Sequence, residues 1–166
     1  HACAKTTLFL TVGAIAYATG TRSMAKLSGL ARTMPIAAVA FFVGAFALTG
    51  IPPLACFWSK MYVLAGALQV EGAFGPTVLV LVVIESLISF GWFLWVGQKV
   101  FFGTPAQTGS PPPPRQPETA SSLQAGPVGA LDPPPSMDWI LVGMIVLTLV
   151  APLVGVPLVS YLTVSP

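Results

Sequence analysis

The stretch GIPPLACFWSK, residues 50–60, decides how the middle of this chain folds. Proline has no amide hydrogen to donate, and it disfavours helical geometry at the residue before it. Pro52 and Pro53 therefore end or interrupt a helix, and Gly50 lies just ahead of them. Apolar residues flank the stretch on both sides, yet Lys60 closes it. The stretch thus predicts a broken helix in an apolar region, with a costly charge seven residues beyond the break.

Composition shows what surrounds this break. The chain has 166 residues, of which 55% are hydrophobic and 7% charged, with a formal net charge of +2. Its mean hydropathy is +0.85. Soluble domains carry about 25% charged residues, so this chain has too few charges to cover a soluble surface. The sequence predicts a multi-pass integral membrane protein whose surroundings are the lipid bilayer, and the small net charge predicts no nucleic-acid partner.

A membrane helix needs about 20 mostly apolar residues, and several segments approach this length. The sequence predicts an all-α fold, a polytopic transmembrane helical bundle with about five transmembrane segments, one of them broken at Pro52-Pro53. The predicted segments are residues 1–19, 35–51, 53–70, 77–102 and 138–162.

The chain divides into three regions. Residues 1–102 hold four membrane segments, and EGAFGP at 71–76 predicts an antiparallel hairpin of the third and fourth. Residues 103–137 read as a proline-rich linker, extended or disordered, with a proline-rich docking site as the alternative. Residues 138–166 hold the final helix. The chain starts within an apolar segment, which suggests the C-terminal part of a longer protein.

Ionisable residues inside apolar segments are candidate functional groups, because a central Lys or Asp costs about 2.5–3.5 kcal/mol on insertion scales and often marks an ion or proton path. Lys5, Lys60 and Glu85 qualify, and His1 is a fourth candidate. Lys60 and Glu85 lie about 13 and 12 residues from the centre of the predicted turn. At about 1.5 Å per residue both lie near mid-membrane at similar depth. Adjacent helices are therefore expected to bring them together.

Each of these residues also has a structural interpretation. Lys60 and Glu85 can form a buried ion pair that merely joins two helices. Lys5 can be a snorkelling side chain near a helix end. His1 is spaced i, i+4 from Lys5, which predicts one shared helix face, but a lone histidine is often a satisfied core residue.

The break itself also has two interpretations. Pro52 and Pro53 free carbonyl groups near residues 48–50, and in a bilayer protein or water must satisfy them. Broken helices at membrane depth are found at ion sites and water-filled cavities, which suits Lys60. The alternative is a plain turn between two helices.

Other chemistry is absent from the sequence. There is no phosphate loop, no Ser-His-Asp set, no CxxC and no haem attachment motif. Cys3 and Cys56 are too far apart for a metal motif and read as small buried hydrophobes. We therefore expect no cofactor, no metal and no catalytic or redox site in this chain.

Two stretches resemble a known family: HACAKTTLFLTVGAIAYATGTRSMAKLSGLARTMP at 1–35 and FFVGAFALTGIPPLACFWSK at 41–60. They are similar to the proton-conducting, antiporter-like membrane subunits of respiratory complex I, of multisubunit cation/proton antiporters and of membrane-bound nickel–iron hydrogenases. IESLISFGWFLWVGQKVF at 84–101 most resembles the hydrogenase-4 type component D. The resemblance covers residues 1–102, about the C-terminal third of such a subunit.

The resemblance implies a role for each matching residue. His1 and Lys5 match a His-x-x-x-Lys motif on a central hydrophilic axis, and Lys60 matches the lysine of the broken helix. Glu85 has no counterpart in most branches, and Cys56 stands where many members have glycine. The implied function is proton translocation in a redox-driven complex of a bacterial or archaeal cell membrane, with other membrane and peripheral subunits as partners. A cation/proton antiporter subunit, with sodium as a second ion, and a purely structural subunit remain alternatives.

Overall fold

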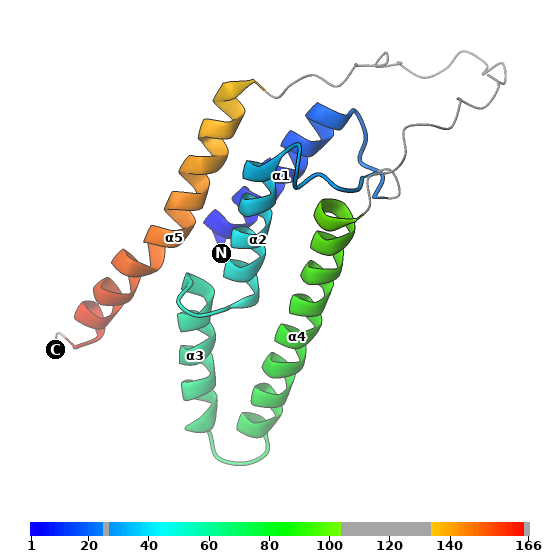
Figure 1. The fold of residues 1–166 in the computed structure, drawn as a ribbon. Helices are drawn as coiled ribbons and strands as arrows, with labels where there is room; N and C mark the ends of the chain where they lie inside the picture. Colours follow the sequence, from blue (N-terminus) through cyan, green and yellow to red (C-terminus); the bar gives the residue numbers. More distant parts are fainter. Residues whose placement is uncertain (25–26, 104–133, 165–166) are drawn as a thin grey trace, which may run out of the picture.

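The protein is all-helical in a computed structural model that describes residues 1–24, 27–103 and 134–164 (Figure 1). Five α-helices and one π-helix make up the described chain. In order they are α1 (Ala2–Thr19), α2 (Pro35–Thr49), α3 (Ala55–Leu68), α4 (Phe74–Gly97), η1 (Gln98–Phe102) and α5 (Pro135–Val164). These elements confirm the predicted all-α class. The predicted linker at 103–137 falls largely outside the described residues.

Three helical stretches are long and apolar enough to cross a membrane: Ala2–Thr19, Phe74–Phe102 and Pro135–Pro157. Helices α2 and α3 are shorter, at 15 and 14 residues. At about 1.5 Å per residue, neither short helix alone covers a hydrocarbon core about 30 Å thick. The sequence left two interpretations here, a broken helix and a plain turn between two helices, so the arrangement of the two helices decides how the bundle is built.

The two short helices, α2 and α3, lie one after the other along α4, and the contacts between side chains show this. Passing from the end of α4 towards its start, the pairs are Phe93 with Phe41, Phe90 with Phe46 and Glu85 with Lys60. Helix α4 therefore runs antiparallel first to α2 and then to α3 (Figure 1). Together α2 and α3 form one interrupted segment, and the break at residues 50–54 faces the middle of α4.

The core lies where α1, α2 and α5 pack together. Small residues let α1 and α2 approach closely, since a Cβ on Gly44 of α2 would lie 3.0 Å from Leu8 Cγ and 3.2 Å from the Ala4 carbonyl oxygen. Small residues at close helix contacts are typical of membrane proteins, where van der Waals packing holds helices together. Helix α5 joins through a buried contact of 3.2 Å between the hydroxyls of Thr7 and Thr148.

The loop between α1 and α2 closes the end of α4. Residues Gln98–Phe102 form a π-helix, and the amides of Leu30 and Ala31 donate to the carbonyl oxygens of Val100 and Phe101 at 3.2 and 3.1 Å. Carbonyls at the end of a helix lack intrahelical partners, and the loop supplies them here. The loop thereby ties α1 and α2 to the end of α4.

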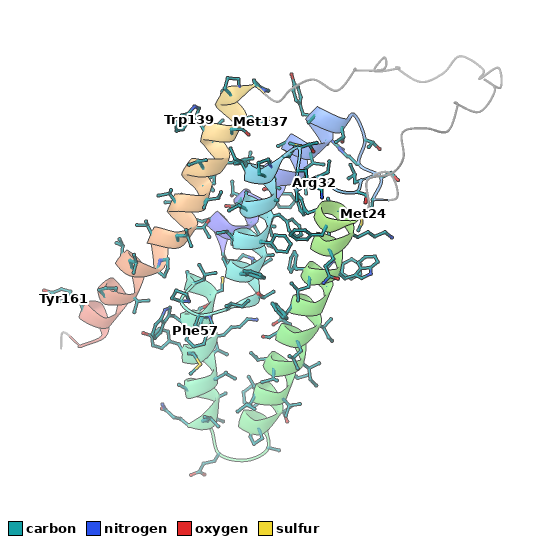
Figure 2. The ribbon with its side chains drawn as sticks, in the orientation of Figure 1. Met24, Arg32, Phe57, Met137, Trp139 and Tyr161 are labelled. Atoms are coloured by element: carbon teal, nitrogen blue, oxygen red, sulfur yellow. The ribbon has the colours of Figure 1, made fainter. Side chains whose placement is uncertain are left out.

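The outer surface is that of a membrane protein. Large apolar side chains project from α4 and α5 along their lengths (Figure 2). Trp139 near one end of α5 and Tyr161 near the other are 75% and 74% exposed, and such residues are enriched at membrane–water interfaces. This surface and the three long apolar spans establish an integral, multi-pass membrane protein.

Candidate functional site

Lys60 lies in the second turn of α3, just after the helix break, and its ammonium group has three partners. The Nζ atom donates to the Thr49 carbonyl oxygen at 3.1 Å, to Glu85 Oε2 at 2.9 Å and to Ser86 Oγ at 2.7 Å. An ammonium group carries three N–H donors, so every donor has one acceptor. The side chain is 24% exposed, and these contacts compensate for removing its charge from water.

The break in the helix supplies one of these acceptors. Thr49 is the last residue of α2, where a continuous helix would bond its carbonyl to a later amide. Gly50 ends α2 with a φ of 85°, a left-handed conformation that favours glycine. A Cβ at this position would also lie 3.2 Å from Lys60 Cδ. Gly50 therefore turns the chain and leaves room for the lysine that satisfies the freed carbonyl.

Glu85 approaches Lys60 from α4, as its predicted depth requires. Its Oε2 forms the ion pair, and its Oε1 accepts a hydrogen bond of 3.0 Å from Ser89 Oγ. The Glu85 side chain is 58% exposed, so its carboxylate has an open side as well as a paired one. The hairpin of α3 and α4 creates this contact between residues 25 positions apart.

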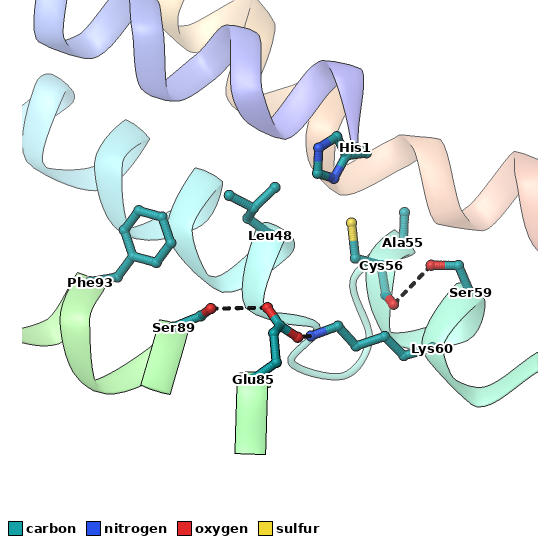
Figure 3. A pocket seen from close by; sticks show the side chains of 9 residues that line it. All are labelled: His1, Leu48, Ala55, Cys56, Ser59, Lys60, Glu85, Ser89 and Phe93. Atoms are coloured by element: carbon teal, nitrogen blue, oxygen red, sulfur yellow. Dashed lines mark hydrogen bonds and ion pairs between the residues drawn. The ribbon is translucent and has the colours of Figure 1, made fainter. Parts of the chain in front are cut away.

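A cavity of about 490 Å³ adjoins the ion pair. Its lining comprises His1, Leu48, Ala55, Cys56, Ser59, Lys60, Glu85, Ser89 and Phe93 (Figure 3). Glycine and proline at the break end α2 early, and the start of α3 forms one wall. The cavity is large enough to hold several waters beside Lys60 and Glu85.

The predicted candidates separate into two groups. His1, Lys60 and Glu85 line one cavity, and Gly50, Pro52 and Pro53 form the break beside it. Lys5 is exposed and is not among the residues that line the cavity. Within the described part of the chain, its side chain has no hydrogen bond or ion pair. The structure therefore brings three of the four candidate ionisable residues together.

Sequence reasoning did not single out two polar partners of the ion pair, the hydroxyls of Ser86 and Ser89. It did predict freed carbonyls near residues 48–50, and the Thr49 carbonyl that contacts Lys60 is one of them. Ser89 follows Glu85 at the i, i+4 spacing that puts two residues on one helix face, so its role could have been predicted. The contact of Ser86 depends on the side from which α3 approaches α4, and the Thr49 contact depends on the path of the break.

This arrangement resembles the sites of one class of membrane protein. An ion pair with its own hydroxyl partners, held beside a helix break and a cavity within apolar helices, is typical of membrane proteins that move ions or protons. Residues 1–89 match the family described as NADH:quinone oxidoreductase/Mrp antiporter, TM, and the chain belongs to this family.

Curated relatives point to the same family. The chain is 35% identical over 98 residues to "Putative antiporter subunit mnhD2" of Staphylococcus aureus strain Mu3 / ATCC 700698, and equally to that of strain N315. These matches cover 57% of this chain and 20% of each relative, so the chain spans about a fifth of the length of these relatives. No solved structure matches the chain.

Proposed function

We propose that this chain is part of a proton-translocating membrane subunit and that Lys60 and Glu85 pass the proton. The observation that carries the proposal is the Lys60 ammonium, bonded to Glu85 Oε2 at 2.9 Å and to the carbonyl freed by the helix break at 3.1 Å. Family membership supports the same function.

The geometry supports a two-step transfer. Lys60, which is protonated in the ion pair, hands its proton to Glu85 along their hydrogen bond, which leaves an amine and a carboxylic acid. Neutralising both partners removes the cost of holding two charges away from water. Glu85 then releases the proton from its open side, and Lys60 can be protonated again. Each cycle moves one proton and leaves the pair as it began.

His1 and Lys5 take different places in this proposal. His1 lines the cavity, so we assign it to the delivery of protons to Lys60. Lys5 lies outside the cavity lining, and only the resemblance of its His-x-x-x-Lys motif supports a role in the relay. We place it earlier on the same path, as a donor to the His1 side.

Two kinds of complex fit this subunit. We propose a redox-driven complex of the hydrogenase-4 or NADH:quinone oxidoreductase type, because residues 84–101 resemble component D of hydrogenase-4. The second candidate is a multisubunit cation/proton antiporter, which the names of the relatives favour. Genes for hydrogenase or quinone-reductase subunits beside this gene would support the first, and genes for small antiporter subunits would support the second.

The decisive experiment measures proton uptake by the full-length protein in its complex, reconstituted in vesicles. Lys60→Ala is compared with Lys60→Arg and with Lys99→Ala, a control lysine in η1 that lies over the Trp95 ring at 5.1 Å to its centroid. We expect Lys60→Ala to reduce uptake to background, Lys60→Arg to be strongly impaired, and Lys99→Ala to retain it.

Assembly is measured alongside uptake by native gel electrophoresis. An intact complex without uptake supports the relay. Normal uptake in Lys60→Ala would show that the pair is structural, and loss of the complex in this variant alone would show that the pair mainly joins α3 to α4.

A further inference from the structure

Ser86 differs chemically from the other partners of Lys60. Its Oγ accepts the Lys60 N–H at 2.7 Å and donates its own hydrogen to the Val82 carbonyl oxygen at 2.7 Å. The other two partners of Nζ, the Thr49 carbonyl and the Glu85 carboxylate, are acceptors only. Since a hydroxyl can donate as well as accept, Ser86 is the partner that can donate to the lysine nitrogen.

This difference matters when Lys60 loses its proton. A neutral amine keeps two N–H donors and gains a lone pair that needs a donor. Glu85 supplies that donor while it holds the proton, but neither the carboxylate left after release nor the Thr49 carbonyl can supply one. The Ser86 hydroxyl can rotate from Val82 to Nζ, and the Val82 carbonyl keeps the helical bond from the amide four residues later. No buried backbone group loses its partner in this change.

We propose that Ser86 is a positioning residue that stabilises both protonation states of Lys60 by reversing its hydrogen bond. The proposal rests on the proposed function and adds a specific residue to it. During transfer, one proton leaves Lys60 Nζ and binds Glu85 Oε2. Ser86 keeps its own proton and only changes the acceptor. Without this hydroxyl, the neutral amine has an unpaired lone pair once Glu85 has released the proton, and that release is disfavoured.

Ser59 and Ser89 provide matched controls. Ser59 lines the same cavity, but its hydroxyl donates to the Cys56 carbonyl at 3.0 Å. Ser89 donates to Glu85 Oε1. Ser59→Ala removes a cavity hydroxyl without touching the pair, and Ser89→Ala removes a hydroxyl from the glutamate alone.

The experiment compares initial rates of proton uptake by the full complex in vesicles. We expect Ser86→Ala to slow uptake about tenfold, because the ammonium keeps Thr49 and Glu85 as acceptors whereas the lone pair of the neutral amine loses its donor. Ser86→Thr keeps the hydroxyl and should restore the rate to within about twofold. Ser59→Ala removes a hydroxyl from the cavity lining but not from the pair, so it should slow uptake much less than Ser86→Ala.

A spectroscopic signature separates this role from simple packing. Infrared difference spectra report the C=O band of protonated carboxylic acids, and Glu85→Gln identifies the band of Glu85. In Ser86→Ala the band should grow, because release of the proton is disfavoured and protonated Glu85 accumulates. Ser89→Ala should shift the band, since its hydroxyl contacts the same carboxyl group.

Failures of the two proposals are distinguishable. If Lys60→Ala abolishes uptake while Ser86→Ala retains the wild-type rate and band, the role of Ser86 is wrong and the relay stands. The role of Ser86 is equally wrong if Ser86→Thr is as slow as Ser86→Ala in an intact complex. If Lys60→Ala retains uptake, the proposed function itself fails.

Discussion

The two halves of α4 face the same interrupted segment with different chemistry. The C-terminal half packs aromatic rings against α2, with Phe93 and Phe90 about 6.2 Å in ring-centroid distance from Phe41 and Phe46. The N-terminal half meets α3 through Glu85 and Lys60 instead. The change from rings to charges falls where the helix break faces α4 (Figures 1 and 3).

The two halves of α4 are suited to different tasks: one to packing against α2, the other to groups that change their charge. Edge and tilted ring contacts contribute about 0.5–1.5 kcal/mol beyond their buried area, and they fix α4 against α2. The polar half has a cavity, an open carboxylate and hydroxyl partners, which suit a group that changes its charge. The C-terminal half of α4 should therefore govern stability, and the N-terminal half should govern transport.

Exchanging the charges of Lys60 and Glu85 should give the largest effect and is the strongest test of the difference between the two halves of α4. The double variant Lys60→Glu with Glu85→Lys keeps an ion pair between α3 and α4 but moves the lysine away from the Thr49 carbonyl. We expect an assembled complex with proton uptake at background, measured in vesicles beside the wild type. Uptake near the wild-type rate would mean that the position of each charge is unimportant.

Removing a ring tests the aromatic half. Phe41 is 6% exposed and contacts Phe93 and Phe101, with a centroid distance of 5.3 Å to the latter. We expect Phe41→Ala to lower the free energy of unfolding by about 3 kcal/mol, because it leaves a cavity in a packed interior. Detergent-induced unfolding measures this change. Transport per assembled complex should stay within about twofold of the wild type, and a larger loss would couple the two halves.

Adding a side chain at Gly44 sharpens the contrast at the contact of α1 and α2. Valine at this position would collide with Leu8 and the Ala4 carbonyl, which lie 3.0 and 3.2 Å from a Cβ there. Overpacking of this kind costs about 1–3 kcal/mol. We expect Gly44→Val to lower the thermal midpoint in detergent. Glycine at 91 is a matched control, because nothing lies within 4 Å of its Cβ position, and Gly91→Val should have a much smaller effect.

The hydroxyl contact of Thr7 and Thr148 should have the smallest effect. Each hydroxyl also donates to the carbonyl four residues earlier, at 2.8 Å. Hydrogen bonds between membrane helices average about 0.6 kcal/mol in double-mutant cycles. We expect Thr148→Val to cost about this much and to leave transport unchanged. A double-mutant cycle with Thr7→Val measures the coupling, and a value above about 2 kcal/mol would contradict a purely local contact.

The sequence predicted the elements closely, because apolar length and prolines act locally. The segment predicted at 35–51 is a helix at Pro35–Thr49, and the turn predicted at 71–76 is observed between Leu68 and Phe74. The similar distances of Lys60 and Glu85 from the turn also predicted their contact, since helical rise converts sequence distance into height. The assignment of a proton relay to these residues stays a prediction.

Other features were beyond sequence reasoning. Two short apolar helices on either side of a proline pair can turn back on each other or follow one another. The helix propensities of their residues are the same in both arrangements, so the local sequence does not distinguish them. The continuous length of α4, which contacts both, shows that they follow one another. For the same reason, the sequence could not show that Lys5 lies outside the cavity lining while His1 lies within it.

By itself, the sequence determined that this is a helical membrane protein, where its helices begin and end, and that charges lie within them. These properties follow from composition, proline and helical rise, which need no knowledge of neighbours. Only the tertiary structure decided that the carbonyl freed at Thr49, the hydroxyl of Ser86 and the carboxylate of Glu85 all converge on Lys60. That convergence depends on how three helices are rotated and stacked, and rotation is set by packing across the whole bundle.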